Sequence, residues 1–157
     1  MKSILVFLLA LVSVNALAES PAVYEKSIDQ NLESVYKQVL KALEDNDFKV
    51  VYEVDMQENL KKFAAKNALK DFNLNQMEAI KSMVFCNGAL AVKISNADPT
   101  MLAMCPLHLT LTQKAGRASV LFVRPSIIAQ GSKAEAPAKE LEEKVIKAIE
   151  SGLKGAQ

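Results

Sequence analysis

The chain has 157 residues, of which 19 are basic and 18 are acidic, so its net charge is +1. This length suits a single domain with one hydrophobic core. The basic residues are scattered among acidic ones and the chain has no Trp, whereas a nucleic-acid-binding surface gathers positive charge and aromatic side chains. We therefore expect no nucleic-acid partner.

The first 18 residues predict a secretory signal peptide. Lys2 gives a short basic start, residues 4–14 are an apolar run, and residues 16–18 form an A-x-A cleavage site. The run is too short for a membrane span, which needs roughly 20 apolar residues, and no later stretch is apolar enough. We therefore expect cleavage near Ala18, no membrane span, and a soluble periplasmic or secreted domain over residues 19–157.

The next part of the chain predicts a strand, a helix and a second strand. Apolar and polar residues alternate from Val23 to Ile28, which is typical of a short strand. Asp29 can cap the following helix, because its carboxylate can accept from free main-chain N–H groups. After a turn at Asn46-Asp47, the alternation from Phe48 to Val54 predicts the second strand. The apolar residues of the helix recur at spacings of three and four and are Leu32, Val35, Tyr36, Val39, Leu40 and Leu43.

A second helix and a third strand are expected next. Asp55 ends the second strand, and a helix cap is favoured over a catalytic acid for its carboxylate. An irregular segment is expected from Ala65 to Leu74, after a short helix. The alternation from Ile80 to Cys86 predicts a strand, with a helix over Gln76 to Met83 as the alternative. The apolar residues of the short helix are Leu60, Phe63 and Ala64, and Lys61, Lys62, Lys66 and Lys70 are expected to form a solvated face.

The C-terminal part predicts a β-hairpin and a last helix. Residues 107–111 alternate, Ala115-Gly116 forms a turn, and residues 120–123 are β-branched and aromatic. A surface linker over residues 126–136 then leads to a helix over about 137–152, opened by its proline and ended by its glycine. These elements predict an α+β fold, a two-layer sandwich whose mainly antiparallel sheet carries helices on one face.

Several segments resemble the bacterial family called domain of unknown function 302. Residues 47–55 resemble its G-F-x-V-x-x-E-I-D strand, and Cys86-Asn87 resembles its A-C-N-P turn. Residues 90–99 resemble its L-A-x-x-x-L-x-x-D-P segment, and Pro106 with the strand after it resembles L-P-C-N-V-x-V. The resemblance covers a core of about 23–125 and implies a fold like that of the TATA-binding protein, but no activity. Gly88 stands where the family usually has Pro, and Leu107 where it has a second cysteine.

The segment Leu90–Ser95 has two interpretations. Its alternation predicts a strand, whereas Leu90 and Ile94 at i, i+4 after Asn87 predict a capped helix, which the family resemblance favours. A second short helix is expected over residues 99–104. In the helical interpretation, one strand ends at Cys86 and the next begins at Leu107, and these two positions lie side by side. Cys86 and Cys105 would then be close enough for a disulfide, which would stabilise the fold by about 3 kcal/mol.

Our leading hypothesis is a non-enzymatic exported domain that binds a small ligand or a partner and is stapled by the Cys86–Cys105 disulfide. No cofactor is required, the partner is unknown, and a homo-oligomer stays open. The sequence shows no convincing paired carboxylates, phosphate-binding loop or Ser–His–Asp set. A catalytic function is therefore not favoured. The candidate ligand-binding residues are Cys86, Asn87, Cys105, His108 and Asp55.

The alternative hypothesis is a periplasmic thiol or soft-metal protein. Thiolate, thioether and imidazole donors suit copper, although Cys105-Pro106-Leu107-His108 is not the C-x-x-C-H motif that attaches haem. Copper or haem would be the cofactor. The donors are Cys86, Met104, Cys105 and His108, with Met101 nearby.

Overall fold

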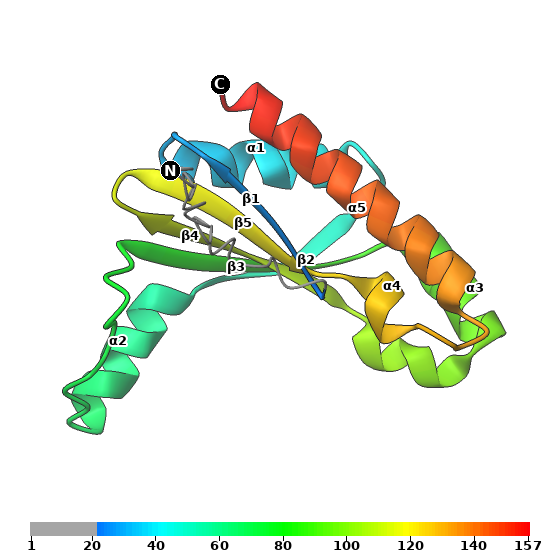
Figure 1. Ribbon diagram of the computed structural model, residues 1–157, viewed down its shortest axis with the longest axis horizontal. Coiled ribbons are helices and arrows are strands. Elements are labelled where there is room, and N and C mark those ends of the chain that lie inside the picture. The colour runs from blue at the N-terminus through cyan, green and yellow to red at the C-terminus, as the bar shows by residue number, and fades with distance from the viewer. Residues whose placement is uncertain (1–21) are drawn as a thin grey trace, which may run out of the picture.

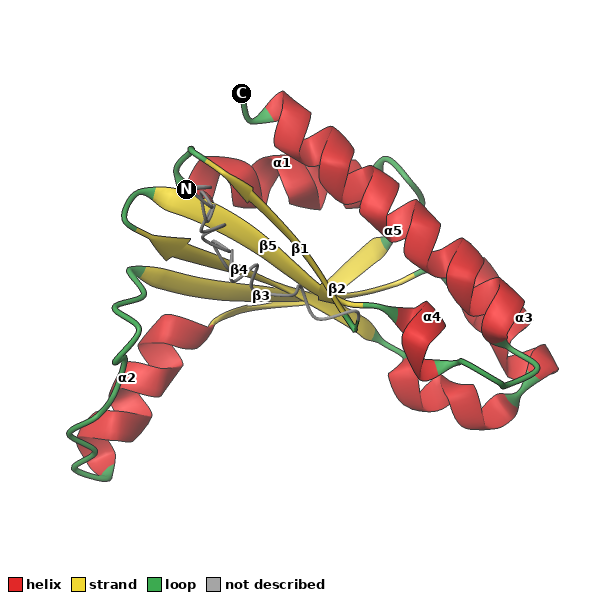
Figure 2. Ribbon diagram, in the orientation of Figure 1, coloured by secondary structure: helices red, strands yellow, loops and turns green. Residues whose placement is uncertain are grey.

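The computed structural model describes residues 22–157, and the signal peptide predicted for residues 1–18 lies outside them. The elements in chain order are β1 Val23–Ile28, α1 Leu32–Glu44, β2 Lys49–Asp55, α2 Met56–Lys66, β3 Ala79–Cys86, α3 Gly88–Ala97, η1 Pro99–Met104 (a 3-10 helix), β4 Leu107–Lys114, β5 Arg117–Val123, α4 Pro125–Ile128 and α5 Glu135–Gly155. The strands form one antiparallel sheet in the order β1-β5-β4-β3-β2. Helices α1 and α5 lie on one face, α3, η1 and α4 gather at one end, and α2 projects beyond the other end (Figures 1 and 2).

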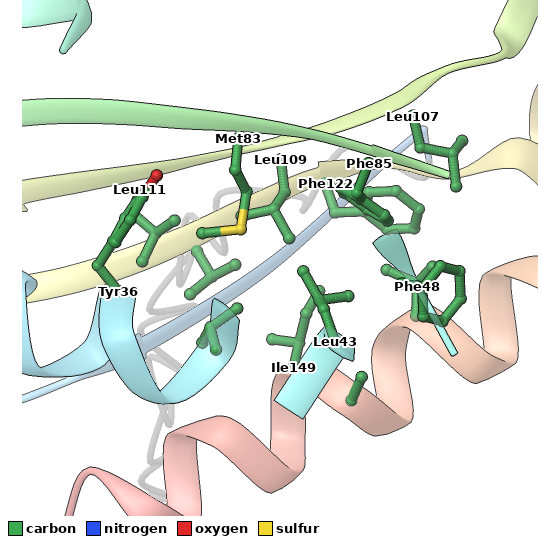
Figure 3. Close-up of a cluster of buried hydrophobic side chains, with 14 of the residues drawn as sticks. Tyr36, Leu43, Phe48, Met83, Phe85, Leu107, Leu109, Leu111, Phe122 and Ile149 are labelled. Atoms are coloured by element: carbon green, nitrogen blue, oxygen red, sulfur yellow. The ribbon is translucent and has the colours of Figure 1, made fainter. Parts of the chain in front are cut away.

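The core lies between the sheet and the pair of helices α1 and α5. Met83 and Phe85 on β3, with Leu109 and Leu111 on β4, point toward the helices and are fully buried (Figure 3). Phe85 meets Phe48 edge to face, with ring centroids 5.6 Å apart, which is a favourable aromatic geometry. One sheet and one helical layer thus enclose the core, and the predicted α+β two-layer sandwich is confirmed.

Helix α1 follows the predicted spacing but not the predicted cap. The side chain of Asn31, not Asp29, accepts a hydrogen bond from the main-chain N–H of Glu33 at 2.8 Å. Asn31 lies directly before the helix, where a side-chain oxygen can reach the first free N–H groups. The turn after the helix is closed by Asp47, whose φ of 64° lies in the left-handed region.

Helix α5 runs past the glycine that was expected to end it. Gly152 is buried inside the helix, and a Cβ at this position would lie 2.7 Å from the Cα of Val39 on α1. A glycine is therefore required here because it lets two helix backbones approach. Pro137 lies in the first turn of α5 rather than opening it. The expected linker over residues 126–136 also overlaps the short helix α4, which begins at Pro125.

Strand β2 forms one edge of the sheet and is irregular. Val50 pairs with Phe85, but the next pair joins Tyr52 to Val84, so Val51 is an extra residue that forms a β-bulge. Val51 is 55% exposed. The bulge lies on the strand whose other side has no neighbouring strand from residues 22–157.

The segment between β3 and β4 is helical, as the family resemblance implies. Helix α3 includes the whole of Leu90–Ser95, so the strand alternative is wrong, and η1 covers the second short helix expected over residues 99–104. The β3 strand ending at Cys86 and the hairpin of β4 and β5 are also confirmed, with positive φ at Ala115 and Gly116 in the turn. Within residues 22–157, no helix has both the length and the apolar character needed to cross a membrane.

Helix α2 and the loop after it form an arm, residues 56–78. The arm extends away from the body of the molecule, which is the sheet with the other helices (Figure 1). The main contacts of the helix are with β3. Gln57 ties the helix to the loop by donating to the main-chain oxygen of Met77 at 3.0 Å. The side chain of Asn73 binds both main-chain polar groups of Met77, with distances of 2.7 and 2.8 Å. The loop is therefore folded back on the helix by side chains rather than by a further strand.

Candidate functional site

Cys86 and Cys105 are free thiols, and the disulfide predicted between them is wrong. Phe85 pairs with Leu107, and continuing this register sets Cys86 opposite Pro106 rather than Cys105. The two cysteines are therefore offset by one residue rather than directly opposite each other, whereas a disulfide needs a specific geometry between its two Cβ atoms. Burial raises the pKa of Cys105, and the charge of Cys86 raises it further.

Asn87 is committed to holding the backbone together. Its side chain donates to the main-chain oxygen of Asp47 at 3.1 Å and accepts from the N–H of Leu90 at 3.0 Å. The residue is buried, so both bonds replace bonds to water that folding removes. Asn87 thus joins the turn before β2 to the start of α3.

Asp55 lies away from the other predicted site residues. It caps α2 by accepting from the N–H of Glu58 at 2.8 Å, as predicted. It pairs with Lys81, which is five residues before Cys86 along β3, so the two ends are separated by roughly 17 Å. The structure therefore does not bring Asp55 to the end of the sheet where Cys86 lies.

The end of the sheet near η1 contains a hollow of about 210 Å³. Leu107 and Phe122 in its lining are buried and belong to the core, whereas His108, Val123 and Ile128 are exposed. The hollow brings together residues from η1, β4, β5 and α4. The lining residues are Ala103, Met104, Pro106, Leu107, His108, Phe122, Val123, Pro125 and Ile128.

The sequence predictions identified only part of this hollow. Met104 and His108 were predicted site residues, and the structure places both in its lining, but the lining does not include Cys86 or Cys105. Pro125 and Ile128 were missed because α4 has only four residues, too few for a periodic pattern. The apolar residues 127–129, which follow Arg124-Pro125, were the sequence signal that could have identified this wall of the hollow.

A buried carboxylate fixes the α4 wall of the hollow. Glu142 on α5 accepts from Arg124 Nε at 2.8 Å and from the main-chain N–H of Ser126 at 3.0 Å. Burial alone would raise the pKa of Glu142, but the hydrogen bonds from Ser126 and Arg124 and the charge of Arg124 outweigh it and lower that pKa. The pair thereby holds the start of α4 against α5.

The donor geometry does not favour the copper or haem hypothesis. Across residues 22–157, no three His, Cys, Asp or Glu side chains come together in a group that could hold a metal ion. His108 is exposed on β4 opposite Val84, while Cys86 and Cys105 are half-buried. Met104 and His108 share the hollow, but two side chains fall short of the three or four protein ligands that such sites use.

Comparisons with known proteins agree on the fold. The model of a protein family described as "Domain of unknown function DUF302" matches residues 24–152. The crystal structure of an uncharacterized conserved DUF302 protein from Bacillus stearothermophilus superposes with a TM-score of 0.72 at 15% sequence identity, covering 84% of this chain and 98% of that one. No protein with a curated description matches the chain. At this identity the superposition supports the architecture alone.

Proposed function

The chain belongs to the DUF302 family, whose description assigns no activity, and on that premise we propose that it is a non-enzymatic domain that binds a small, mainly apolar ligand. The hollow beside His108 carries this proposal. Its lining is apolar except for one imidazole and main-chain groups, which is the usual composition of a ligand site. The site lies at the junction of four elements and so combines groups that no single element could present.

The volume of the hollow limits the class of ligand. A cavity of about 150 Å³ lined by apolar side chains can hold benzene, and this hollow measures about 210 Å³. A single aromatic ring or a short acyl group therefore fits, whereas drug-sized ligands occupy about 300 Å³ or more. His108 at the rim can donate or accept a hydrogen bond. An aromatic acid with its ring inside and its carboxylate near His108 satisfies both constraints.

The experiment uses benzoate as the probe and chemical shifts of the amide groups as the readout. Benzoate is expected to shift signals from residues around the hollow, and Ile128→Trp, which fills the rim, should weaken binding at least tenfold. Ile127→Trp is the matched control, because Ile127 is exposed on the same helix but does not line the hollow. Equal binding to both variants would contradict the proposal.

We also propose that the domain is exported, with residues 1–18 removed. The support is the basic start, the apolar run and the A-x-A site in the sequence. Mass spectrometry of protein recovered from the periplasm or medium should give a chain that begins at Glu19. A chain that keeps residue 1 and stays in the cytoplasm would contradict export.

A further inference from the structure

The arm formed by residues 56–78 exposes several large apolar side chains close together. Leu60 is 40% exposed, Phe63 59% and Leu69 53%. With Phe72 they surround a hollow of about 240 Å³ that the other residues of the described range, 22–157, leave open. Leu74, at 77% exposed, lies on the same loop. Contiguous apolar surface of this kind marks a site of interaction.

The same arm carries positive charge beside the apolar cluster. The arm contains three acidic residues, Glu58, Asp71 and Glu78, and four lysines, which are Lys61, Lys62, Lys66 and Lys70. Within the described part of the chain, only Lys62 of these lysines forms an ion pair, with Glu58 at 3.5 Å on the exposed surface. Glu78 lies at the base of the arm, where its carboxylate accepts from the main-chain N–H of Gly116. Residues 56–77 therefore carry an excess of two positive charges, which favours an anionic occupant.

From this combination we propose that the arm binds an anionic lipid surface, with Phe63, Leu60 and Leu69 entering the interface between headgroups and acyl chains. Amphipathic segments with Phe and Leu on one side and lysines on the other bind membranes in this way. Lysine stems can lie along the apolar layer while their ammonium groups reach the headgroups. The arm projects from the body (Figure 1), so it can reach a flat surface without a clash from the sheet.

A second copy of the chain fits the arm less well. A twofold interface brings the same patch of each copy together, so two arms that each carry an excess of positive charge would be brought into contact. Like charges at short range are destabilising. This inference is independent of the hollow beside His108, which lies at the other end of the sheet, and the two proposals can fail separately.

The experiment uses the mature chain as it is recovered from the cell, with its N-terminus established by mass spectrometry. Because the chain has no Trp, Phe63→Trp provides a single fluorescent reporter. Vesicles of equal parts phosphatidylglycerol and phosphatidylcholine should shift its emission to shorter wavelength, and vesicles of phosphatidylcholine alone should not. Val92→Trp is the control, because Val92 is also 59% exposed but lies on α3. Its emission should stay unchanged with both kinds of vesicle.

Vesicle sedimentation then separates the two parts of the interaction. Lys66→Glu with Lys70→Glu should weaken binding at least 25-fold, since each lysine near an anionic surface contributes about fivefold. Phe63→Ser should weaken it at least tenfold, and 1 M salt should abolish most of it. Lys139→Glu with Lys147→Glu, on exposed positions of α5, is the charge control and should reduce binding less than threefold.

Three outcomes would overturn the proposal. The first is equal binding to anionic and neutral vesicles, which would show that the charge of the lipid surface does not contribute. The second is binding that the arm variants leave unchanged. The third is a dimer in sedimentation equilibrium that Phe63→Ser dissociates while vesicles remain unbound, which would make the arm an interface between copies of the chain.

Discussion

Helices α1 and α2 start in the same way but bury very different surfaces. Each has a side-chain cap, from Asn31 and Asp55 respectively, and each carries an acidic residue in its first turn and a lysine in its last. Helix α1 buries six residues, whereas α2 buries only Gln57 and Ala64. An amphipathic pattern thus shows that a helix has a face to cover, but the rest of the chain decides whether it is covered.

The cover for α1 is α5, and it depends on one close contact. Gly152 lets the α5 backbone approach Val39 on α1, so apolar side chains on both helices reach the same core. Among the residues that the structure describes, helix α2 has no such partner and contacts the rest of the domain mainly through β3. The body and the arm therefore differ in how much of the stability of the fold each carries, and substitutions can measure that difference.

The largest expected effect compares two phenylalanines. Phe85→Ala should lower the free energy of unfolding by about 4 kcal/mol, because it removes a fully buried ring from the core. Phe63→Ala should change it by less than about 0.5 kcal/mol, because the ring is mostly exposed on the arm. Urea unfolding followed by circular dichroism measures both. Comparable losses would show that the arm is an integral part of the body.

The next effect tests the close contact between α1 and α5. Gly152→Val should lower the free energy of unfolding by about 3 kcal/mol, since its side chain would meet the backbone of Val39 and overpack the contact. Gly155→Val is the control on the same helix, because a Cβ there meets only the flexible side chain of Gln38. Thermal unfolding of both variants gives the comparison, and equal losses would rule out backbone contact as the cause.

The smallest effect concerns α4, which is held by one carboxylate. Glu142→Gln should lower the free energy of unfolding by about 2 kcal/mol at pH 7, because a buried charge-assisted bond is lost. Folding lowers the pKa of Glu142 below its ordinary 4.5, so its stabilisation is present above that pH and is lost as the pH falls through the folded value. Urea titrations of wild type and variant should converge below about pH 4.5.

A pH-independent difference between these two proteins would show that Glu142 stabilises the fold through packing rather than charge. The control is Glu143→Gln, because Glu143 is exposed on the same helix. This variant should match the wild type across the whole pH range.

Periodicity and capping chemistry were enough to predict most of the fold. The spacing of apolar residues located α1, and the β4–β5 hairpin followed from its alternation and its Ala115-Gly116 turn. Leu90–Ser95 could not be assigned in this way, because its alternation fits a strand while its i, i+4 pair fits a helix. The cap from Asn87 decides for the helix, and the family resemblance pointed to the same answer.

The candidate site was harder to predict because it depends on register and on short elements. The prediction of a Cys86–Cys105 disulfide was wrong, because the register of β3 and β4 offsets the two cysteines by one residue. Local sequence does not determine that register. Gly152 was interpreted as a helix end, because glycine is common just after the last residue of a helix. Only the position of α1 shows that Gly152 instead allows the two helix backbones to approach. Met104 and His108 were found from their chemistry, but the α4 wall of their hollow was not.

The bulge at Val51 has a consequence for how the molecule behaves at high concentration. An edge strand with regular main-chain groups can pair with the edge of another molecule and begin an aggregate. At Val51 the hydrogen-bonding ladder of β2 is interrupted and the strand twists, so a second molecule cannot continue the sheet across this edge in register. The bulge, which lies beside the exposed side chains of Val51 and Tyr52, therefore opposes polymerisation by strand addition.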